Sequence, residues 1–472
     1  MSVSIPFDNS YARLDPAFYA SLAPTPVSEP SLLAWNTRLA QDLGIDPGTE
    51  SDRASVFGGN TVPADASPIA QLYAGHQFGN WNPQLGDGRA ILLGEVTPSN
   101  KRFDIQLKGS GPTPFSRMGD GRAWLGPVLR EYVVSEAMHA FGVPTTRALA
   151  AVATGESVFR EQGALPGAVL TRVASSHLRV GTFQIFASRG QTELLQDLTD
   201  YAIARHYPDA DGPMGLLQAV VHAQAQLVAH WMGLGFIHGV MNTDNCTISG
   251  ETIDYGPCAF MDSYDEARVF SSIDQTGRYA YGNQPRIIVW NMAQFATSLI
   301  QLFDDKDAAV AKATDIVHGM PALIQDAWLS RFGRKIGIAD ATPEDQPLIE
   351  ELLTMMQTGQ SDFTNTFRAL GTGNSAAEIL DQVAFTAWLK RWQDRLKSEK
   401  APEDVMHKAN PVLIPRNHRI EEMIETAVAG DMTLFEQMTQ ALSSPYDVNA
   451  EFDDLRRAPK SDEIVPATFC GT

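Results

Sequence analysis

Two carboxylates and an amide follow a long apolar stretch near the middle of the chain: Asp244, Asn245 and Asp254. Carboxylate and amide oxygens are the ligands that Mg²⁺ prefers where it also holds the phosphates of a substrate. The surrounding stretch is rich in turn residues, so a polar connection without chemical function is the alternative interpretation. A matching set of residues earlier in the chain favours a nucleotide-handling site.

Glycine-rich turns precede these acids by more than a hundred residues. The pentapeptide Gly-Asp-Gly-Arg-Ala occurs at 86–90 and again at 119–123. Glycine permits positive φ and lets backbone amides approach a phosphate. We interpret the repeat as two turns with a similar backbone conformation. Five residues are too few to demonstrate an internal duplication. It contributes Gly86, Gly88 and Arg89 from the first turn, and Asp120 and Gly121 from the second.

A lysine and a glutamate stand between and after these turns. Residues 103–108 alternate between apolar and polar, which predicts a strand that ends at Lys108 on its polar face. A helix is expected over 128–141, with Glu131 on its apolar stripe. A carboxylate on an inward stripe needs a cationic partner. Lys108 is the candidate, and such a pair is suited to holding phosphate oxygens.

The elements that must position these residues change character along the chain. Short strands are expected in the first part, at 90–96, 103–108, 147–152 and 167–173, together with a helix over 32–43 and the helix over 128–141. The remainder is mostly helical, with helices expected at 191–206, 213–234, 290–304, 306–318, 321–332, 347–357, 361–370, 375–398 and as a pair around 419–441. The helix beginning near 290 is expected to pack under the loop of Asp244.

Composition limits the classes of function. The 472 residues carry 36 basic and 56 acidic side chains, a net charge of −20, which argues against nucleic acid as a partner. No apolar run approaches the ~18 residues that span a bilayer, and the first residues do not resemble a secretory signal. Three cysteines form no CxxC pair. We therefore expect a cytoplasmic protein without a membrane partner.

The order of the functional residues is that of a protein kinase, with one break. In the kinase motif H-R-D-L-x-x-x-N, the catalytic Asp stands five residues before the metal-binding Asn. Here Val240 stands five residues before Asn245, so the usual base is absent while the Asn and the Asp254-Tyr255-Gly256 aspartate are present. A conventional kinase mechanism is therefore in doubt.

These motifs resemble the selenoprotein O family, the pseudokinase-like protein adenylyltransferases, and in particular their cysteine-containing bacterial-type members. The resemblance covers nearly the whole chain and rests on the stretches FDNSYARL (7–14), YAGHQFG (73–79), QLKGSG (106–111), HGVMNTDN (238–245), DYGP (254–257) and RNH (416–418). It implies an α+β, protein-kinase-like two-lobed fold with a small strand-rich N-lobe, a larger helical C-lobe and a helical C-terminal extension. The corresponding segments are a lead-in at 1–65, the N-lobe at 66–186, the C-lobe at 187–305 and the extension with its tail at 306–472.

The family resemblance also implies the reaction and the site. AMP would pass from ATP to Ser, Thr or Tyr hydroxyls of proteins, with Mg²⁺ or Mn²⁺ and with the nucleotide bound flipped relative to a kinase. Asp244 resembles the proton acceptor, and Asn245 and Asp254 resemble the metal ligands. The nucleotide contacts would come from Gly86, Gly88, Arg89, Lys108 with Glu131, Asp120, Gly121, Arg172, Arg179 and Asp254. Arg172 and Arg179 would hold the outer phosphates, for which paired guanidiniums are well suited.

The sequence alone leaves two other functions open. One is a kinase-like phosphotransferase in which Asp244 is a displaced base, and the other is a catalytically dead nucleotide-binding scaffold. The nucleotide product distinguishes them. Separately, we expect Cys470, near the end of the chain, to form mixed disulfides with outside thiols rather than a bridge to Cys258.

Overall fold

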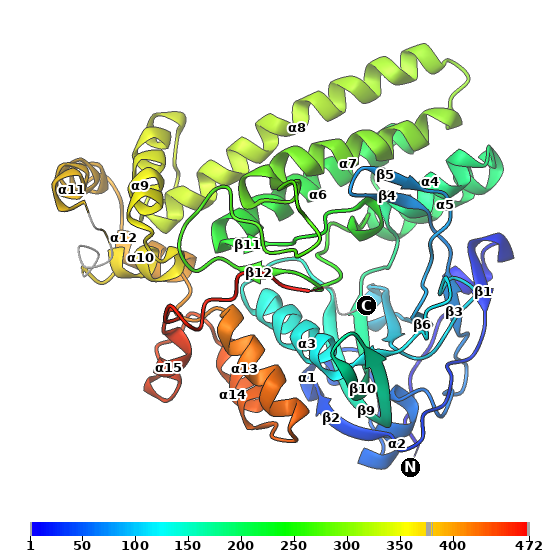
Figure 1. Ribbon diagram of the computed structural model, residues 1–472. Helices are drawn as coiled ribbons and strands as arrows, with labels where there is room; N and C mark the ends of the chain where they lie inside the picture. The colour runs from blue at the N-terminus through cyan, green and yellow to red at the C-terminus, as the bar shows by residue number, and fades with distance from the viewer. Residues whose placement is uncertain (1, 374–378, 380, 470–472) are drawn as a thin grey trace.

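An antiparallel sheet and a larger helical region make up the computed structural model, which describes residues 2–373, 379 and 381–469 (Figure 1). The sheet has the strand order β1-β3-β6-β7-β10-β9-β2, with β8 paired to β10. Its strands are β1 (Tyr19–Ser21), β2 (Ser31–Trp35), β3 (Ile69–Gln71), β6 (Ala90–Val96), β7 (Phe103–Lys108), β8 (Ala123–Trp124), β9 (Arg147–Arg160) and β10 (Gly163–Ala174). Two small ribbons add β4 (Gly75–Gln77) with β5 (Asn80–Asn82), and β11 (Phe236–Ile237) with β12 (Ala259–Phe260).

The helices occupy mainly the second half of the chain. They are α1 (Thr37–Asp42), α2 (Glu50–Phe57), α3 (Leu125–Ala140), α4 (Val180–Ser188), α5 (Thr192–His206), α6 (Gly212–Leu234), α7 (Gln284–Leu299), α8 (Lys306–Lys335), α9 (Gln346–Gly359), α10 (Phe363–Leu370), α11 (Gln382–Leu396), α12 (Pro402–Ala409), α13 (Asn417–Val428), α14 (Thr433–Leu442) and α15 (Asp453–Arg456). The mixed content of strands and helices is as expected from the sequence.

Strand β7 lies in the middle of the sheet, which places Lys108 among buried neighbours. Lys108 is in register with Ala90 of β6 and with Leu170 of β10. Arg172 of β10 is in register with Gln106 of β7, so their side chains emerge on the same face of the sheet. The alternation read from the sequence therefore brings a lysine and an arginine to one face.

Helix α3 is held between the sheet and the C-terminal helices (Figure 1). Pro127 lies in its first turn, and Gly142 follows it with a φ of 78°, as expected for a helix end. One side of α3 contacts β9 and β10, and the other contacts α13 and α14, where the rings of Tyr132 and Phe435 meet edge to face at 5.5 Å. The helix that carries Glu131 is thus fixed on both sides.

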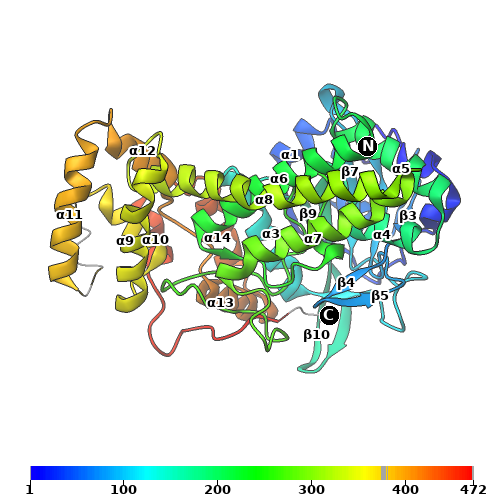
Figure 2. The same ribbon diagram turned by 90° about the horizontal axis from the view of Figure 1, so that it is seen from above.

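Helices α6, α7 and α8 pack against one another, and α9 to α12 lie at one end of α8 (Figures 1 and 2). The Asn291 side chain of α7 donates to the carbonyl of Met241 at 3.1 Å, and the Gln284 side chain donates to the carbonyl of Phe236 at 3.0 Å. These bonds confirm that α7 packs under the loop of Asp244. None of the described helices is long and apolar enough to cross a membrane.

Three expectations about secondary structure were wrong. The apolar run at 32–35 belongs to strand β2, and the helix starts only at Thr37 after its N-cap Asn36. The two helices expected at 306–318 and 321–332 are one helix, α8, which continues through Pro321. Helix α4 was missed because its sequence begins with a glycine and β-branched residues, which have low helix propensity.

The C-terminal tail runs back along the segment that follows Asp254. The amide of Thr468 donates to the carbonyl of Phe270 at 2.7 Å, and its hydroxyl donates to the carbonyl of Pro257 at 2.5 Å. The amide of Ser272 returns a bond of 3.0 Å to the carbonyl of Thr468. Cys470, for which we expected mixed disulfides, lies outside the described residues.

Candidate active site

A cavity of about 470 Å³ collects nearly all the residues singled out from the sequence. Its lining includes Gly86, Gly88, Arg89, Lys108, Asp120, Gly121, Arg172, Arg179, Asp244, Asn245 and Asp254. Glu131 is the exception, and it stands behind Lys108. The lining has seven basic side chains, the others being Arg117, Arg122 and Arg160, and four acidic ones, the remaining one being Asp87. In a chain with a net charge of −20, this is a local concentration of positive charge suited to polyphosphate.

Four charged side chains form one connected group on the wall of the cavity. Lys108 Nζ lies 2.6 Å from both Glu131 Oε2 and Asp254 Oδ1. Arg172 Nη1 lies 2.7 Å from the same Asp254 oxygen and 3.3 Å from Glu131 Oε1. Burial would raise the pKa of Asp254, but Lys108 and Arg172 outweigh it and hold that pKa well below its usual range. The expected Lys108–Glu131 pair is confirmed, and Asp254 is held ionised.

Arg179 is oriented by two side chains that sequence reasoning did not single out. Its guanidinium lies 4.4 Å from the centre of the Tyr73 ring, and its Nη1 lies 3.3 Å from Asp87 Oδ1. The Arg179 side chain is 1% exposed, and among the described residues its Nε has no hydrogen-bond partner. Arg179 lines the cavity, and a guanidinium oriented there is suited to bind an anion.

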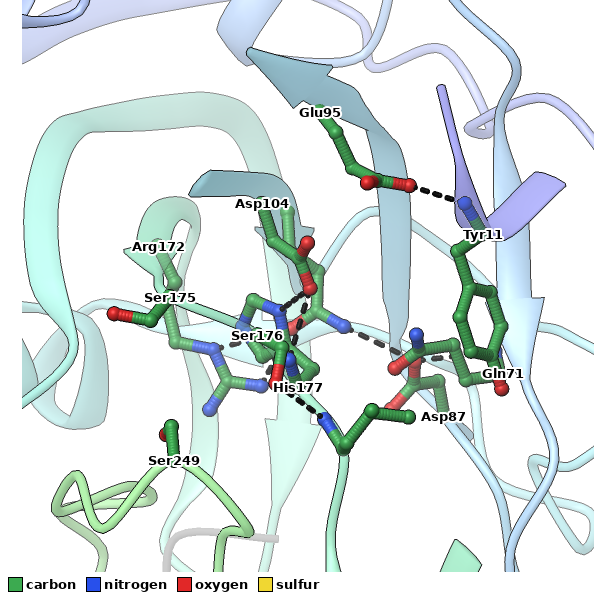
Figure 3. Close-up of polar contacts among 12 residues, drawn as sticks. Tyr11, Gln71, Asp87, Glu95, Asp104, Arg172, Ser175, Ser176, His177 and Ser249 are labelled. Atoms are coloured by element: carbon green, nitrogen blue, oxygen red, sulfur yellow. Dashed lines mark hydrogen bonds and ion pairs between the residues drawn. The ribbon is translucent and has the colours of Figure 1, made fainter. Parts of the chain in front are cut away.

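A buried group of polar side chains that includes Asp87 and Gln71 lies near Arg172 (Figure 3). Gln106 accepts from Arg172 Nη2 at 2.6 Å and donates from its own amide to Asp87 Oδ2 at 3.0 Å. The backbone amide of Gln71 donates to the same Asp87 oxygen at 3.2 Å. Gln106 therefore links the orientation of Arg172 to that of Asp87, and through Asp87 to Arg179.

The β4–β5 hairpin lies against the loop that carries Asp244. The backbone amide of His76 donates to the Thr243 hydroxyl at 2.7 Å, and Gln77 Nε2 donates to Asp244 Oδ2 at 2.8 Å. The other carboxylate oxygen of Asp244 is buried, and the described residues offer it no hydrogen-bond partner. Burial raises the pKa of Asp244 to about 6, against the lowering effect of the Gln77 bond. That oxygen lies against Gly75, where an added Cβ atom would come within 3.2 Å of it, so the carboxylate is held on both sides at the edge of the cavity.

The donor set near Asp244 fits a magnesium or manganese ion. Asn245 Nδ2 donates to the carbonyl of Val240 at 3.0 Å, which leaves the amide oxygen available as a ligand. Asp254 supplies carboxylate oxygens on the same cavity wall. Within the described part of the chain, no group of three or more His, Cys, Asp or Glu side chains converges on a metal position. An ion held here would therefore complete its coordination with phosphate oxygens and water.

The Gly-rich turns leave no room for side chains. Gly121 has a φ of 66°, and a Cβ atom placed on it would lie 2.2 Å from the carbonyl carbon of Gly111. Asp120, beside it, is paired with Arg160 at 2.7 Å. A Cβ on Gly86 would meet the Phe115 ring at 2.5 Å. Close approach to the backbone of Gly111 accounts for glycine at 121, and close approach to the Phe115 ring accounts for glycine at 86.

Sequence reasoning missed Gln77, Tyr73, Asp87 and Gln106 as parts of this site. Gln77 and Tyr73 belong to the stretch YAGHQFG, and Asp87 lies between the glycines of the first turn, so each stood inside a motif already noticed. Within these motifs, only the neighbouring residues had side chains whose chemistry made them candidates for the site. Gln106 faces the same way as Lys108 on β7, and that shared face was the one available signal.

Comparison with known proteins agrees with this geometry. The model of the family described as protein adenylyltransferase SelO matches residues 2–443. The chain belongs to the SelO family. It is 66% identical over 473 residues to the protein nucleotidyltransferase YdiU of Roseobacter denitrificans, and 56% identical over 481 residues to the YdiU of a Jannaschia species. The YdiU of Bradyrhizobium diazoefficiens is 52% identical over 492 residues, and each alignment covers 100% of both chains. This SelO-family chain is accordingly an enzyme of the nucleotidyltransferase class.

Proposed function

We propose that this chain transfers AMP from ATP to the hydroxyl of a Ser, Thr or Tyr side chain on a protein substrate. The hydroxyl oxygen attacks the α-phosphorus, the bond from that phosphorus to the bridging oxygen breaks, and pyrophosphate leaves. The proton of the hydroxyl passes to Asp244. The observation that carries the proposal is the position of the Asp244 carboxylate in the lining of the cation-rich cavity, where burial raises its pKa to about 6, a value suited to accepting a proton.

The basic side chains of the cavity support a flipped nucleotide. If the α-phosphorus lies beside Asp244, the outer phosphates need their own cations farther along the wall. Among the described residues the Arg179 guanidinium forms an ion pair with Asp87 alone, whereas Arg172 holds both Glu131 and Asp254 in place. We assign phosphate binding mainly to Arg179 and Lys108, with Arg89 and the Gly-rich turns at Gly88 and 119–123 contributing backbone and side-chain donors.

Asn245 and Asp254 would hold Mg²⁺ or Mn²⁺ together with the phosphates. The bound ion supplies charge stabilisation for the leaving pyrophosphate. The chain's own contribution is to keep both ligands oriented, Asn245 through its bond to Val240 and Asp254 through Lys108 and Arg172.

The proposal includes a two-lobed, kinase-like arrangement. The N-lobe would comprise 66–186 with the lead-in at 1–65, the C-lobe 187–305, and the helical extension 306–472. The Lys108–Glu131 pair supports it, because a strand lysine held by a helix glutamate is a feature of kinases. We place the activity in the cytoplasm, where ATP and protein acceptors meet, with no nucleic acid or membrane as partner.

The decisive experiment follows the label of ATP. Incubation with casein, and with the chain itself as acceptor, is expected to transfer label from ATP labelled at the α-phosphorus and none from ATP labelled at the γ-phosphorus. Asp244→Asn should reduce the transfer by about 10²- to 10⁴-fold, the range of general-base catalysis, with ATP affinity in calorimetry nearly unchanged. Asp315→Asn, an exposed position on α8, is the matched control.

Each other outcome has a definite meaning. Transfer of γ-label would establish phosphotransfer in place of adenylylation. ATP binding without transfer of either label would indicate a scaffold. Transfer by Asp244→Asn at the rate of the unaltered chain would remove Asp244 as the proton acceptor.

A further inference from the structure

A second cavity, far along the chain from the Gly-rich turns, concentrates positive charge without any acid. Its volume is about 370 Å³, and it is lined by the C-terminal ends of α6 and α8, by α12 and by the residues just after α3. The basic side chains of its lining are His230, Arg331, Arg334, Lys335 and Lys408. No Asp or Glu belongs to the lining, although acids outnumber bases 56 to 36 in the sequence.

The buried members of this cluster have no counterion among the described residues. Lys335 is 3% exposed, and its Nζ lies 4.3 Å from the centre of the Phe367 ring, with no ion pair or hydrogen bond to a side chain. The Nε of Arg331 and the Nδ1 of His230 are buried without hydrogen-bond partners within the described part of the chain. Burial lowers the pKa of Lys335 to about 7, and the pKa of Arg331 is lowered to about 10 by burial, with Arg334 adding to the lowering.

Helix C-termini are the competing explanation for these cations. Basic side chains near the last turn of a helix gain about 0.3–1 kcal/mol from the helix dipole, and Arg334 and Lys335 stand in the last turn of α8. Yet none of the four Arg and Lys side chains donates a hydrogen bond to a described backbone carbonyl. A partial charge at the helix end does not compensate several full charges brought together around a partly enclosed space.

We propose that this cavity binds a small molecule that carries a phosphate group and a short apolar or aromatic part. Arginine forks and lysine ammonium groups match phosphate oxygens. The rest of the wall is apolar, with Phe141, Val143 and Tyr446 among its residues. The volume lies near the lower end of the range for small-molecule sites, about 300–1,000 Å³. The net charge of −20 disfavours long polyanions such as nucleic acids.

Phenyl phosphate has both features of the proposed ligand and serves as the probe. Calorimetric titration of the full chain is expected to show saturable binding. Arg334→Ser combined with Lys408→Ser should weaken it by about tenfold or more, because the variant lacks two charge-assisted contacts to the phosphate. Both residues are exposed, so the variant is expected to fold, and its thermal unfolding should match that of the controls.

Two variants with the same change in charge complete the design. Lys306→Ser with Lys312→Ser removes two exposed lysines from the other end of α8 and should bind phenyl phosphate as the unaltered chain does. Arg89→Ser with Arg117→Ser removes two cations from the first cavity, which can itself attract a phosphate, and should retain the binding component that Arg334→Ser with Lys408→Ser loses. The proposal is overturned if the unaltered chain does not bind the probe, if Arg334→Ser with Lys408→Ser leaves the affinity unchanged, or if only Arg89→Ser with Arg117→Ser lowers it. Because AMP transfer is not measured, the outcome is independent of the proposed reaction.

Discussion

Gln77 donates a hydrogen bond of 2.8 Å from its side-chain amide to one oxygen of Asp244, and the other oxygen of that carboxylate has no partner among the described residues. Gln77 and Asp244 both line the cavity, so this bond fixes the orientation of the carboxylate there. The donor comes from the β4–β5 hairpin, 167 residues before its acceptor. Orientation of the proposed proton acceptor thus depends on a distant part of the sequence.

Gln77→Ala should lower kcat by about 10- to 100-fold with little change in KM for ATP, because the lost bond to a charged group contributes about 1.5–3 kcal/mol. Gln77→Glu should be at least as damaging, since it places a second carboxylate beside Asp244. Steady-state kinetics of label transfer from α-labelled ATP provides the measurement. Gln84→Ala, at an exposed position just after the hairpin, is the control. A rise in KM with unchanged kcat would show that Gln77 binds nucleotide instead of positioning Asp244.

Arg179→Lys should lower kcat/KM for ATP by about tenfold or more, because an ammonium group cannot reproduce the paired donors of a guanidinium. Asp87→Asn should act in the same direction but more weakly, since it loosens Arg179 without removing its charge. Calorimetric titration with ATP and the divalent ion, alongside the kinetics, separates loss of binding from loss of turnover. Arg189→Lys, at an exposed position after α4, is the matched control. Equal ATP affinity in Arg179→Lys and the unaltered chain would remove Arg179 from phosphate binding.

Gly121→Ala should abolish ATP binding and lower the free energy of unfolding by about 1–3 kcal/mol, because the added Cβ meets the backbone of Gly111 at 2.2 Å and φ is positive. The control is Gly319→Ala on α8, where a Cβ meets nothing within 4 Å. That change should be neutral or stabilising by up to about 1 kcal/mol. Chemical denaturation measures both. Full ATP affinity in Gly121→Ala would show that the second turn can shift without consequence.

His206 should make the fold sensitive to acid. Burial, with a further contribution from Arg205, lowers its pKa to about 3. The unfolded chain therefore binds a proton at this position between pH 6.5 and 3 where the folded chain does not, so the stability present above pH 6.5 is lost as pH falls through that window. His206→Gln retains a partner for the Ser176 hydroxyl and should reduce the loss by about 1–2 kcal/mol at pH 5.

The measurement for His206 is chemical denaturation at a series of pH values between 7 and 4. His222→Gln, which removes an exposed histidine from α6, is the matched control. Parallel pH profiles for the unaltered chain and His206→Gln would show that His206 is solvated in the folded state.

Residues in strongly patterned segments were predictable. The alternation over β7 predicts a strand that ends at Lys108, and the Pro and Gly at the two ends of α3 predict the helix that carries Glu131. The sequence pattern therefore indicates both partners of the Lys108–Glu131 pair. By contrast, the apolar run of β2 fits a strand and a helix equally well, and only its pairing with β9 decides between them. Pro321 suggested a helix boundary, yet α8 continues because a long helix packed on α6 and α7 tolerates one missing backbone hydrogen bond.

The supporting residues of the site were the least predictable. Asp87 and Gln106 act through contacts between segments that are distant in sequence, and Gln77 reaches Asp244 only once the hairpin has docked. No periodicity or spacing carries that information. Composition and local pattern identify which side chains could take part in binding or catalysis. The partners that orient those side chains depend on tertiary packing.

The contacts of Thr468 with Pro257 and Phe270 tie the segment after Asp254 to the end of the chain. Synthesis proceeds from the N-terminus, and earlier parts of a protein begin to fold first. The sheet, the Gly-rich turns and the loop of Asp244 can therefore assemble before Thr468 leaves the ribosome. The segment after Asp254 gains this backbone partner only once Thr468 has emerged, so a product that stops before Thr468 keeps its phosphate-binding side chains but lacks that anchor.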